Sequence, residues 1–201
     1  KYLIVIAAHK VFIGLLLGAT FEVVLVSISG SVFVLGEGGG MGLGLIFAAT
    51  GIGMGLGPII ARKWTRDRLP ILAWAILIGY LIGGLGIALT ATLDSWAAVL
   101  VGNLLRGVGN GMAWLFSTQL VLVLVPGYIR GRVVAVEAAL SMLASAIGAA
   151  LVGIFLDSSL GISGTAWWMA GLTLLPALLW GLWTLTVGRN TPIFSYQGAN
   201  S

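Results

Sequence analysis

Two ionisable residues of opposite charge lie deep inside long apolar stretches of this chain. Glu22 lies within GLLLGATFEVVLVSIS, and Arg106 lies within VGNLLRGVGNGMAW. An ionisable group at the centre of a bilayer costs about 2.5–3.5 kcal/mol on insertion scales, so it usually has a function or a partner. A carboxylate can carry a proton, and a guanidinium nearby influences its charge. Proton transfer coupled to substrate binding is therefore the first chemistry that these residues indicate.

Polar residues accompany both charges at helical spacing. Glu22 and Ser29 are seven positions apart and share one face of a helix. Around the arginine the intervals are 3, 4, 4 and 3, which also define one face, over Asn103, Arg106, Asn110, Trp114 and Ser117. Two polar faces at one depth predict a water-accessible cavity in which the asparagines offer hydrogen bonds to a substrate. The alternative is a buried Glu–Arg pair that only holds two helices together.

Six apolar stretches must position these residues, and each has the roughly 20 residues that a membrane-spanning helix needs. The chain is 59% hydrophobic and 8% charged, whereas soluble domains carry about 25% charged residues. We therefore predict an all-α integral membrane protein in which residues 1–190 form a six-helix transmembrane bundle and residues 191–201 a polar cytoplasmic tail. The expected spans are Val11–Leu35 (with a possible start at Tyr2), Met41–Ala61, Leu69–Ala91, Trp96–Val125, Val133–Leu156 and Thr165–Val187.

Basic residues divide the links between the spans into two classes. The second and fourth links and the two chain ends contain lysine or arginine, whereas the only charged residues in the first, third and fifth links are acidic. Because Lys and Arg stay in cytoplasmic loops, we expect both termini in the cytoplasm and a multi-pass location in a bacterial cytoplasmic membrane. The basic residues are Lys1, Lys10, Arg62, Lys63, Arg66, Arg68, Arg130, Arg132 and Arg189, and the acids are Glu37, Asp94 and Asp157.

Glycines recur at spacings of four within the spans. Small residues at this spacing let helices pack closely in lipid. The packing is either static, or it forms surfaces that slide when a transporter changes state. The pairs are Gly51 with Gly55, Gly53 with Gly57, Gly79 with Gly83, and Gly107 with Gly111.

Two segments resemble parts of the major facilitator superfamily of transporters. GNLLRGVGNGMAW is similar to the arginine-glycine motif of a cavity-lining helix in that family. LVPGYIRGRVVAVEAALSMLASAIGAALVGIFLD is similar to the loop between helices ten and eleven and the small-residue-rich helix after it. The similarity is greatest to the drug and siderophore exporter branch. It runs from the first span to Arg189, but it covers only one six-helix half of a twelve-helix transporter.

The resemblance also implies which half this is. In GPIIARKWTRDR, Gly57, Arg62 and Arg66 match the family's Gly-x-x-x-Asp-Arg-x-Gly-Arg loop motif, whereas Ala61 and Trp64 depart from it. Such a weakened motif is typical of the second half, so the spans are interpreted as helices seven to twelve. The first and fourth spans would line the cavity, the second and fifth would contact the other half, and the third and sixth would face lipid.

A cytoplasmic gate is the implied role of the basic links. Arg130 and Arg132 could pair with a carboxylate, with carbonyls at a helix C-terminus, or with anionic lipid headgroups, and Glu137 is the nearest acid in sequence. The alternative is that these arginines only set the topology. The gate candidates are Arg130, Gly131, Arg132, Glu137, Arg62 and Arg66.

The leading hypothesis is a secondary active transporter, a proton-coupled antiporter that exports a small amphipathic compound by alternating access. Glu22 would carry the proton, and Arg106, Asn103, Asn110 and Ser29 would complete the cavity. The expected partners are the substrate, protons, the lipid bilayer and a second six-helix half or a homodimer partner. The alternative is a non-transporting scaffold or assembly subunit of a larger membrane complex.

Other classes are disfavoured by what the sequence lacks. It has one histidine, His9, and no cysteine, so we expect no metal site and no cofactor. Nothing resembles a nucleophile with its base or a paired-carboxylate site, so an enzyme is not expected. The net charge of +4 is spread over the links instead of forming a dense basic stripe, so nucleic-acid binding is not expected.

Overall fold

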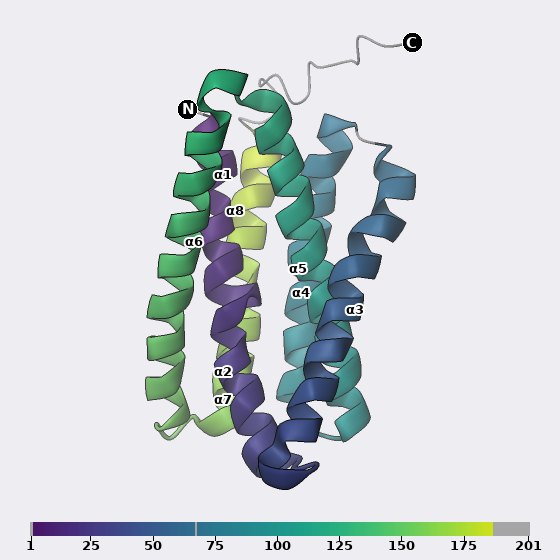
Figure 1. Ribbon diagram of the computed structural model, residues 1–201, viewed down its shortest axis with the longest axis vertical. Helices are drawn as coiled ribbons and strands as arrows, with labels where there is room; N and C mark the ends of the chain where they lie inside the picture. The colour runs from purple at the N-terminus through teal and green to yellow at the C-terminus, as the bar shows by residue number, and fades with distance from the viewer. Residues whose placement is uncertain (1, 67, 187–201) are drawn as a thin grey trace.

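In the computed structural model the chain forms six helical stretches that run alternately up and down one bundle (Figure 1). The structure describes residues 2–66 and 68–186. Within them all regular elements are helical, and six stretches are long and apolar enough to cross a membrane, which confirms the predicted all-α, six-span class. The elements are α1 (Tyr2–Phe12), the π-helix η1 (Ile13–Leu17), α2 (Ala19–Ser27), the π-helix η2 (Ile28–Val32), the 3-10 turn η3 (Glu37–Gly39), α3 (Gly40–Thr65), α4 (Leu69–Ala91), α5 (Trp96–Leu124), α6 (Gly127–Leu156), α7 (Gly161–Leu172) and α8 (Leu174–Leu185).

Two helix starts follow directly from local sequence. The hydroxyl of Ser95 caps α5 by accepting a hydrogen bond of 3.1 Å from the backbone N–H of Ala98. Pro126 keeps Val125 extended (φ −89°, ψ 128°) and ends α5. Because a helix can begin at once after a proline, α6 starts at Gly127, earlier than the Val133 that hydropathy alone indicates.

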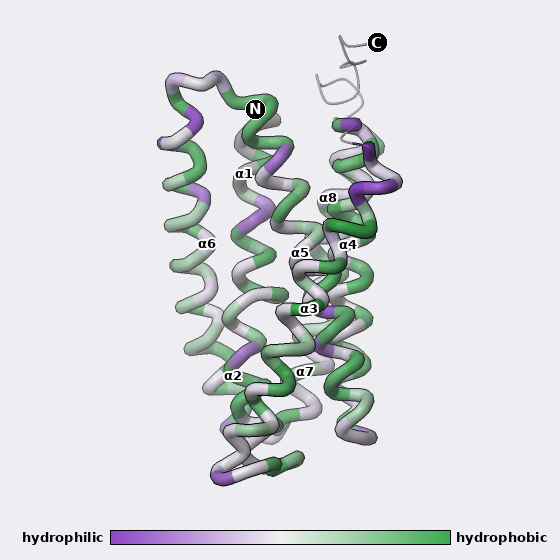
Figure 2. Tube along the Cα trace, turned by 45° about the vertical axis from the view of Figure 1, so that its right-hand side comes forward, coloured by the Kyte–Doolittle hydropathy of each residue, from purple (hydrophilic) through white to green (hydrophobic). Residues whose placement is uncertain are grey.

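The basic and acidic links lie at opposite ends of the bundle. The α3–α4 and α5–α6 turns, the start of α1 and the end of α8 lie at one end, and η3 and the α4–α5 and α6–α7 turns lie at the other (Figure 1). Hydrophilic residues gather towards the ends, with isolated ones between them (Figure 2). That the basic end faces the cytoplasm stays a prediction. Lys1, Val187, Arg189 and the predicted tail lie outside the described residues.

Close packing of α5 against α3 and α4 depends on glycine. A Cβ added at Gly107 would overlap the backbone of Thr50 on α3, and one at Gly109 would overlap the backbone of Gly79 and Gly83 on α4. Of the two glycine pairs on α3, Gly51 with Gly55 and Gly53 with Gly57, only the second packs against the backbone of α5 in this way. Gly51 and Gly55 are exposed, with open space where a Cβ would stand.

The second and fifth spans are the least covered by the rest of the chain. Their most apolar windows are 28% buried in α3 and 22% buried in α6, against 56% in both α4 and α5. The exposed face of α6 is apolar and includes Val136, Leu140, Leu143, Ile147 and Leu151. In this fold α3 and α6 therefore present the largest uncovered apolar faces.

Candidate functional site

The first span is broken near its middle, at Gly18. The preceding turn, η1, is π-helical, so the N–H of Gly18 reaches back five residues to the carbonyl of Ile13, at 2.9 Å. Gly18 then leaves helical geometry (φ −89°, ψ −140°) before α2 starts at Ala19. A break of this kind removes the usual N–H partners of the carbonyls just before it. These carbonyls become acceptors for neighbouring helices.

Arg106 of α5 binds one of the freed carbonyls. Its Nη1 donates to the carbonyl of Leu17 at 2.6 Å, which places a positive charge at the C-terminal end of a half-helix, where the helix dipole favours a cation. Its Nε donates to Asn103 Oδ1 and its Nη2 to Thr50 Oγ1, both at 3.2 Å. The guanidinium also lies 5.2 Å from the ring centre of Phe21. Arg106 is 1% exposed, so neutral acceptors and one ring hold a fully buried cation at the break.

A second freed carbonyl joins the break to the fifth span. The Gly14 carbonyl accepts hydrogen bonds from Ser145 Oγ of α6 at 2.9 Å and from Thr20 Oγ1 at 3.2 Å. Thr20 Oγ1 also lies 3.3 Å from the carbonyl of Ser145. Both sides of the broken turn are therefore held by side chains, from α5 on one side and α6 on the other.

Glu22 lies one turn beyond the break and faces outward. Its side chain is exposed, on the same side of α2 as Ala19 and Val26. The ion pairs among the described residues do not include one between Glu22 and Arg106. The structure thus leaves the Glu22 carboxylate exposed and the Arg106 guanidinium buried.

The other polar residues that the sequence analysis placed in the cavity make hydrogen bonds within the bundle. Asn103 Nδ2 donates to the Val99 carbonyl at 2.9 Å and lies 3.3 Å from Thr90 Oγ1, so its amide positions Arg106 and joins α5 to α4. Asn110 faces α3, and Ser29 is 2% exposed and bonds to the carbonyl of Val26. Trp114, on the same face of α5, is 39% exposed.

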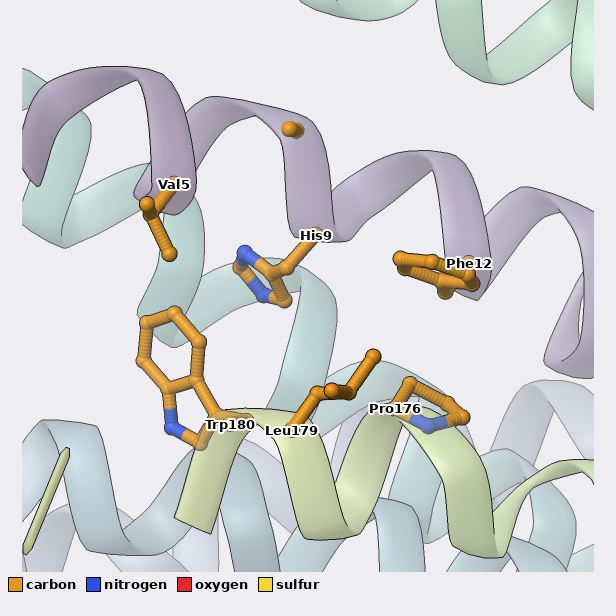
Figure 3. A pocket seen from close by; sticks show the side chains of 7 residues that line it. Val5, His9, Phe12, Pro176, Leu179 and Trp180 are labelled. Carbon is orange, nitrogen blue, oxygen red and sulfur yellow. The ribbon is translucent and has the colours of Figure 1, made fainter. Parts of the chain in front are cut away.

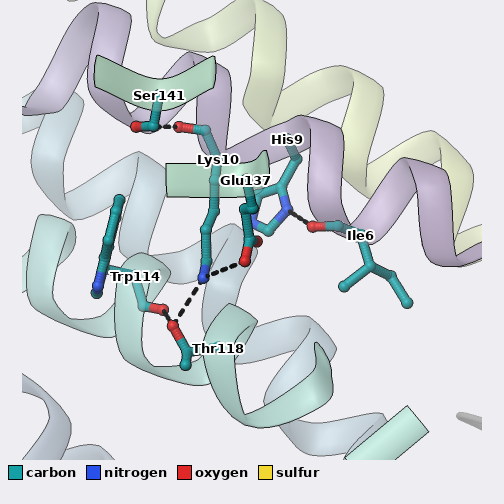
Figure 4. Close-up of polar contacts among 7 residues, drawn as sticks. All are labelled: Ile6, His9, Lys10, Trp114, Thr118, Glu137 and Ser141. Carbon is teal, nitrogen blue, oxygen red and sulfur yellow. Dashed lines mark hydrogen bonds and ion pairs between the residues drawn. The ribbon is translucent and has the colours of Figure 1, made fainter. Parts of the chain in front are cut away.

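A second charged cluster joins α1, α5 and α6 (Figure 4). Lys10 of α1 lies 3.0 Å from Glu137 Oε2 of α6, and these side chains are only 3% and 2% exposed. Lys10 Nζ also donates to Thr118 Oγ1 of α5 at 2.8 Å and lies 4.9 Å from the ring centre of Trp114. Ser141 Oγ donates to the Lys10 carbonyl at 3.3 Å. The cluster therefore ties α1 to both α5 and α6.

From the sequence, Lys10 had only a topological role, and Glu137 was the nearest acid that Arg130 or Arg132 could pair with; the structure pairs Glu137 with Lys10 instead. The signal for a partner was present, because Lys10 stands inside the apolar run YLIVIAAHKVFIGLLL. A lysine in such a run needs a buried acceptor unless it reaches the interface.

The arginines of the basic links take other positions. Arg130 Nε and Nη2 lie 3.3 and 3.2 Å from the Val125 carbonyl at the C-terminal end of α5. Of the three kinds of partner expected for this arginine, it therefore contacts a carbonyl at a helix C-terminus. Arg132, Arg62 and Arg66 are exposed, as is Gly131. No group of three or more His, Cys, Asp or Glu residues within 2–66 and 68–186 could hold a metal ion.

Comparison with known proteins gives a structural similarity only. No protein-family model matches the sequence, and no curated protein is recognisably similar to it. The inward-open conformation of the xylose transporter XylE from E. coli matches with a TM-score of 0.66 at 22% identity. The match covers 98% of this chain and 50% of that one, so the chain spans about half the length of XylE. The six spans therefore have the fold of about half of that transporter chain.

Proposed function

We propose that this chain is one six-helix half of a secondary active transporter that works by alternating access. The observation that carries the proposal is the broken first span, whose freed Leu17 carbonyl is bound by the buried Arg106. Discontinuous helices near the middle of the membrane are where secondary transporters bind substrates and coupling ions. The fold supports the proposal, as do the uncovered apolar faces of α3 and α6, where a second half or a second copy would pack.

Glu22 is proposed as the proton carrier. Its carboxylate is exposed on the surface of the six-helix unit, while Arg106 is buried and joins α5 to the break. Protonation would remove the attraction between carboxylate and guanidinium, and so change how firmly the two half-helices are held. Asn103 and Thr50 would keep Arg106 in place throughout. The substrate of this proposal is a small amphipathic compound moved outward in exchange for protons.

The basic end is proposed as the cytoplasmic gate. Arg130 joins the start of α6 to the end of α5, and Glu137 joins α6 to Lys10 of α1. These contacts hold α1, α5 and α6 together, the first at the start of α6 and the second ten residues further along it. Arg62, Arg66, Arg132 and Gly131 would complete the gate by facing the other half or the lipid headgroups.

Transport in inverted membrane vesicles tests the function. Vesicles containing the full-length protein are energised with a proton gradient, and uptake of a panel of amphipathic fluorescent compounds is followed with and without a protonophore. Glu22→Gln should abolish gradient-driven uptake without loss of protein from the membrane, whereas the matched Glu37→Gln in the first link should transport normally. Unchanged gradient-driven uptake by Glu22→Gln would remove Glu22 from the mechanism.

A scaffold that does not transport is the second candidate, and the uncovered apolar face of α6 favours it equally. Mild detergent extraction followed by native mass measurement separates the two. A homodimer or a complex with another six-helix segment supports transport. A fixed stoichiometry with an unrelated membrane assembly supports the scaffold.

A further inference from the structure

The uncovered surface of α3 has a stripe of large apolar side chains that ends in a tryptophan. Four residues at intervals of four form this stripe, and each is between 45% and 80% exposed, which places them on one side of the helix. At 1.5 Å per residue the stripe follows about 18 Å of helix, close to the roughly 15 Å of hydrocarbon in one leaflet of a bilayer. It therefore has the length of a single acyl chain. The residues of the stripe are Ile52, Leu56, Ile60 and Trp64.

Exposed cations surround the end of the stripe, at the basic end of the bundle. Trp64 is 80% exposed in the last turn of α3, and basic residues lie on both sides of it in the sequence. The N–H of Arg66 donates to the carbonyl of Arg62 at 3.0 Å, so the α3–α4 turn closes directly onto the end of the helix. The basic residues outnumber the one acid of this link, Asp67. An anionic group beside Trp64 would therefore be attracted to the turn. The exposed basic residues are Arg62, Lys63, Arg66 and Arg68.

The order of side chains along α3 matches the order of groups in a phospholipid. A tryptophan ring prefers the boundary between acyl chains and headgroups, because the ring is apolar and its N–H is a donor. The apolar stripe lies on one side of the Trp64 ring along the helix, where acyl chains are found, and the cations lie on the other, where phosphates are found. Charge and apolar surface thus indicate the same kind of partner.

Two other uncovered surfaces lack this combination. The glycine face of α3, with Gly51 and Gly55, lies about 100° round the helix from the stripe, and its open space suits the close approach of another helix. A second half or a second copy can therefore pack on the glycine face while the stripe stays in contact with lipid. An apolar crevice of about 220 Å³ lies between α1 and α8 (Figure 3), but the residues that line it include no lysine or arginine.

We propose that the stripe and the α3–α4 turn form a binding site for one anionic phospholipid. The acyl chain lies along the stripe, the Trp64 ring lies at the boundary, and the phosphate accepts hydrogen bonds from the exposed basic residues of the turn. The turn selects an anionic headgroup over a zwitterionic one, because a zwitterionic headgroup carries a cation of its own. The site depends on the membrane-spanning fold and not on transport.

Quenching of Trp64 fluorescence by brominated lipids tests the site on the full-length protein in vesicles. The vesicles contain equal parts of phosphatidylglycerol and phosphatidylcholine, with bromine on the acyl chains of one or the other. Because the chain has 8 tryptophans, the Trp64 contribution is taken as the difference between the unaltered protein and Trp64→Phe. Phosphatidylglycerol should bind about fivefold more tightly than phosphatidylcholine, which corresponds to the roughly 1 kcal/mol that one basic residue contributes near a membrane surface. About 1 M NaCl should weaken this preference by screening.

Lys63→Gln/Arg68→Gln should bring the two lipids to within about twofold of each other, because half of the basic residues of the turn are removed. Neither residue is a gate candidate, so this result is independent of the transport proposal. Arg132→Gln, which removes an exposed cation from α6, is the matched control and should keep the preference. Equal quenching by the two lipids in the unaltered protein, or a preference that survives in the double variant, would overturn the proposal. It would also be overturned if neither lipid quenched Trp64, since a second half or a second copy would then cover the stripe.

Discussion

Breaking the Lys10–Glu137 pair should destabilise the protein in a strongly non-additive way. The two charges are 3.0 Å apart and nearly inaccessible, and removing one partner of such a buried pair costs about 3–5 kcal/mol because the other charge is left unpaired. Glu137→Gln should fall near the lower end of this range, since Lys10 keeps its bond to Thr118 and the ring of Trp114. Lys10→Met should fall near the upper end, because among the described residues Glu137 has no partner besides the Lys10 ammonium.

The double variant carries the decisive comparison. With both charges gone, Lys10→Met/Glu137→Gln should lie within about 1 kcal/mol of the starting protein, because the cost of each single variant comes from an unpaired buried charge and the double variant has none. In thermal unfolding followed by tryptophan fluorescence in detergent, Glu137→Gln should lower Tm by about 6–12 °C, at about 2–4 °C per kcal/mol for a chain of this size. Glu37→Gln, in the exposed first link, is the matched control and should leave Tm unchanged. A double variant that loses the sum of the two single effects would refute the reasoning.

Two further variants test the break and the helix packing by the same unfolding measurement. Arg106→Lys should cost about 2–3 kcal/mol, because an ammonium cannot reproduce the planar fork that reaches three acceptors; Arg132→Lys at the exposed basic end should cost nothing measurable, and equal stability of the two variants would contradict the assigned contacts. Gly53→Ala should cost about 1–3 kcal/mol, because its Cβ would overlap the backbone of α5, whereas Gly51→Ala on the same helix has open space. A smaller loss in Gly53→Ala than in Gly51→Ala would mean that α3 is turned the other way.

The close glycine contacts show why periodicity predicted packing without deciding its direction. Spacing identified both overlapping pairs on α3, and either could have faced a neighbouring helix. The structure packs Gly53 and Gly57 and leaves Gly51 and Gly55 exposed. The choice depends on where Leu104 and Val108 of α5 lie, and nothing in the local sequence of α3 carries that information.

The charged residues show a similar division. That Arg106 and Asn103 lie on one face of α5 could be inferred from their three-residue spacing. The burial of Arg106 could not be, because the same spacing was equally consistent with a water-accessible cavity. The Leu17 carbonyl as its main acceptor could not be, because that acceptor exists only where a π-helical turn and a non-helical glycine release it. A glycine in a membrane helix is common, so Gly18 alone did not indicate a break.

The sequence by itself determined that the chain is an all-helical bundle of six apolar spans, because length, composition and the sorting of charges among the links act locally along the chain. Only the tertiary structure decided which carbonyls Arg106 binds, that Glu22 faces outward, and that Lys10 pairs with Glu137. Each of these depends on side chains that are distant in sequence being brought to one depth by helix packing. A charged residue inside an apolar span predicts that a partner exists, but which residue is the partner depends on how the helices pack.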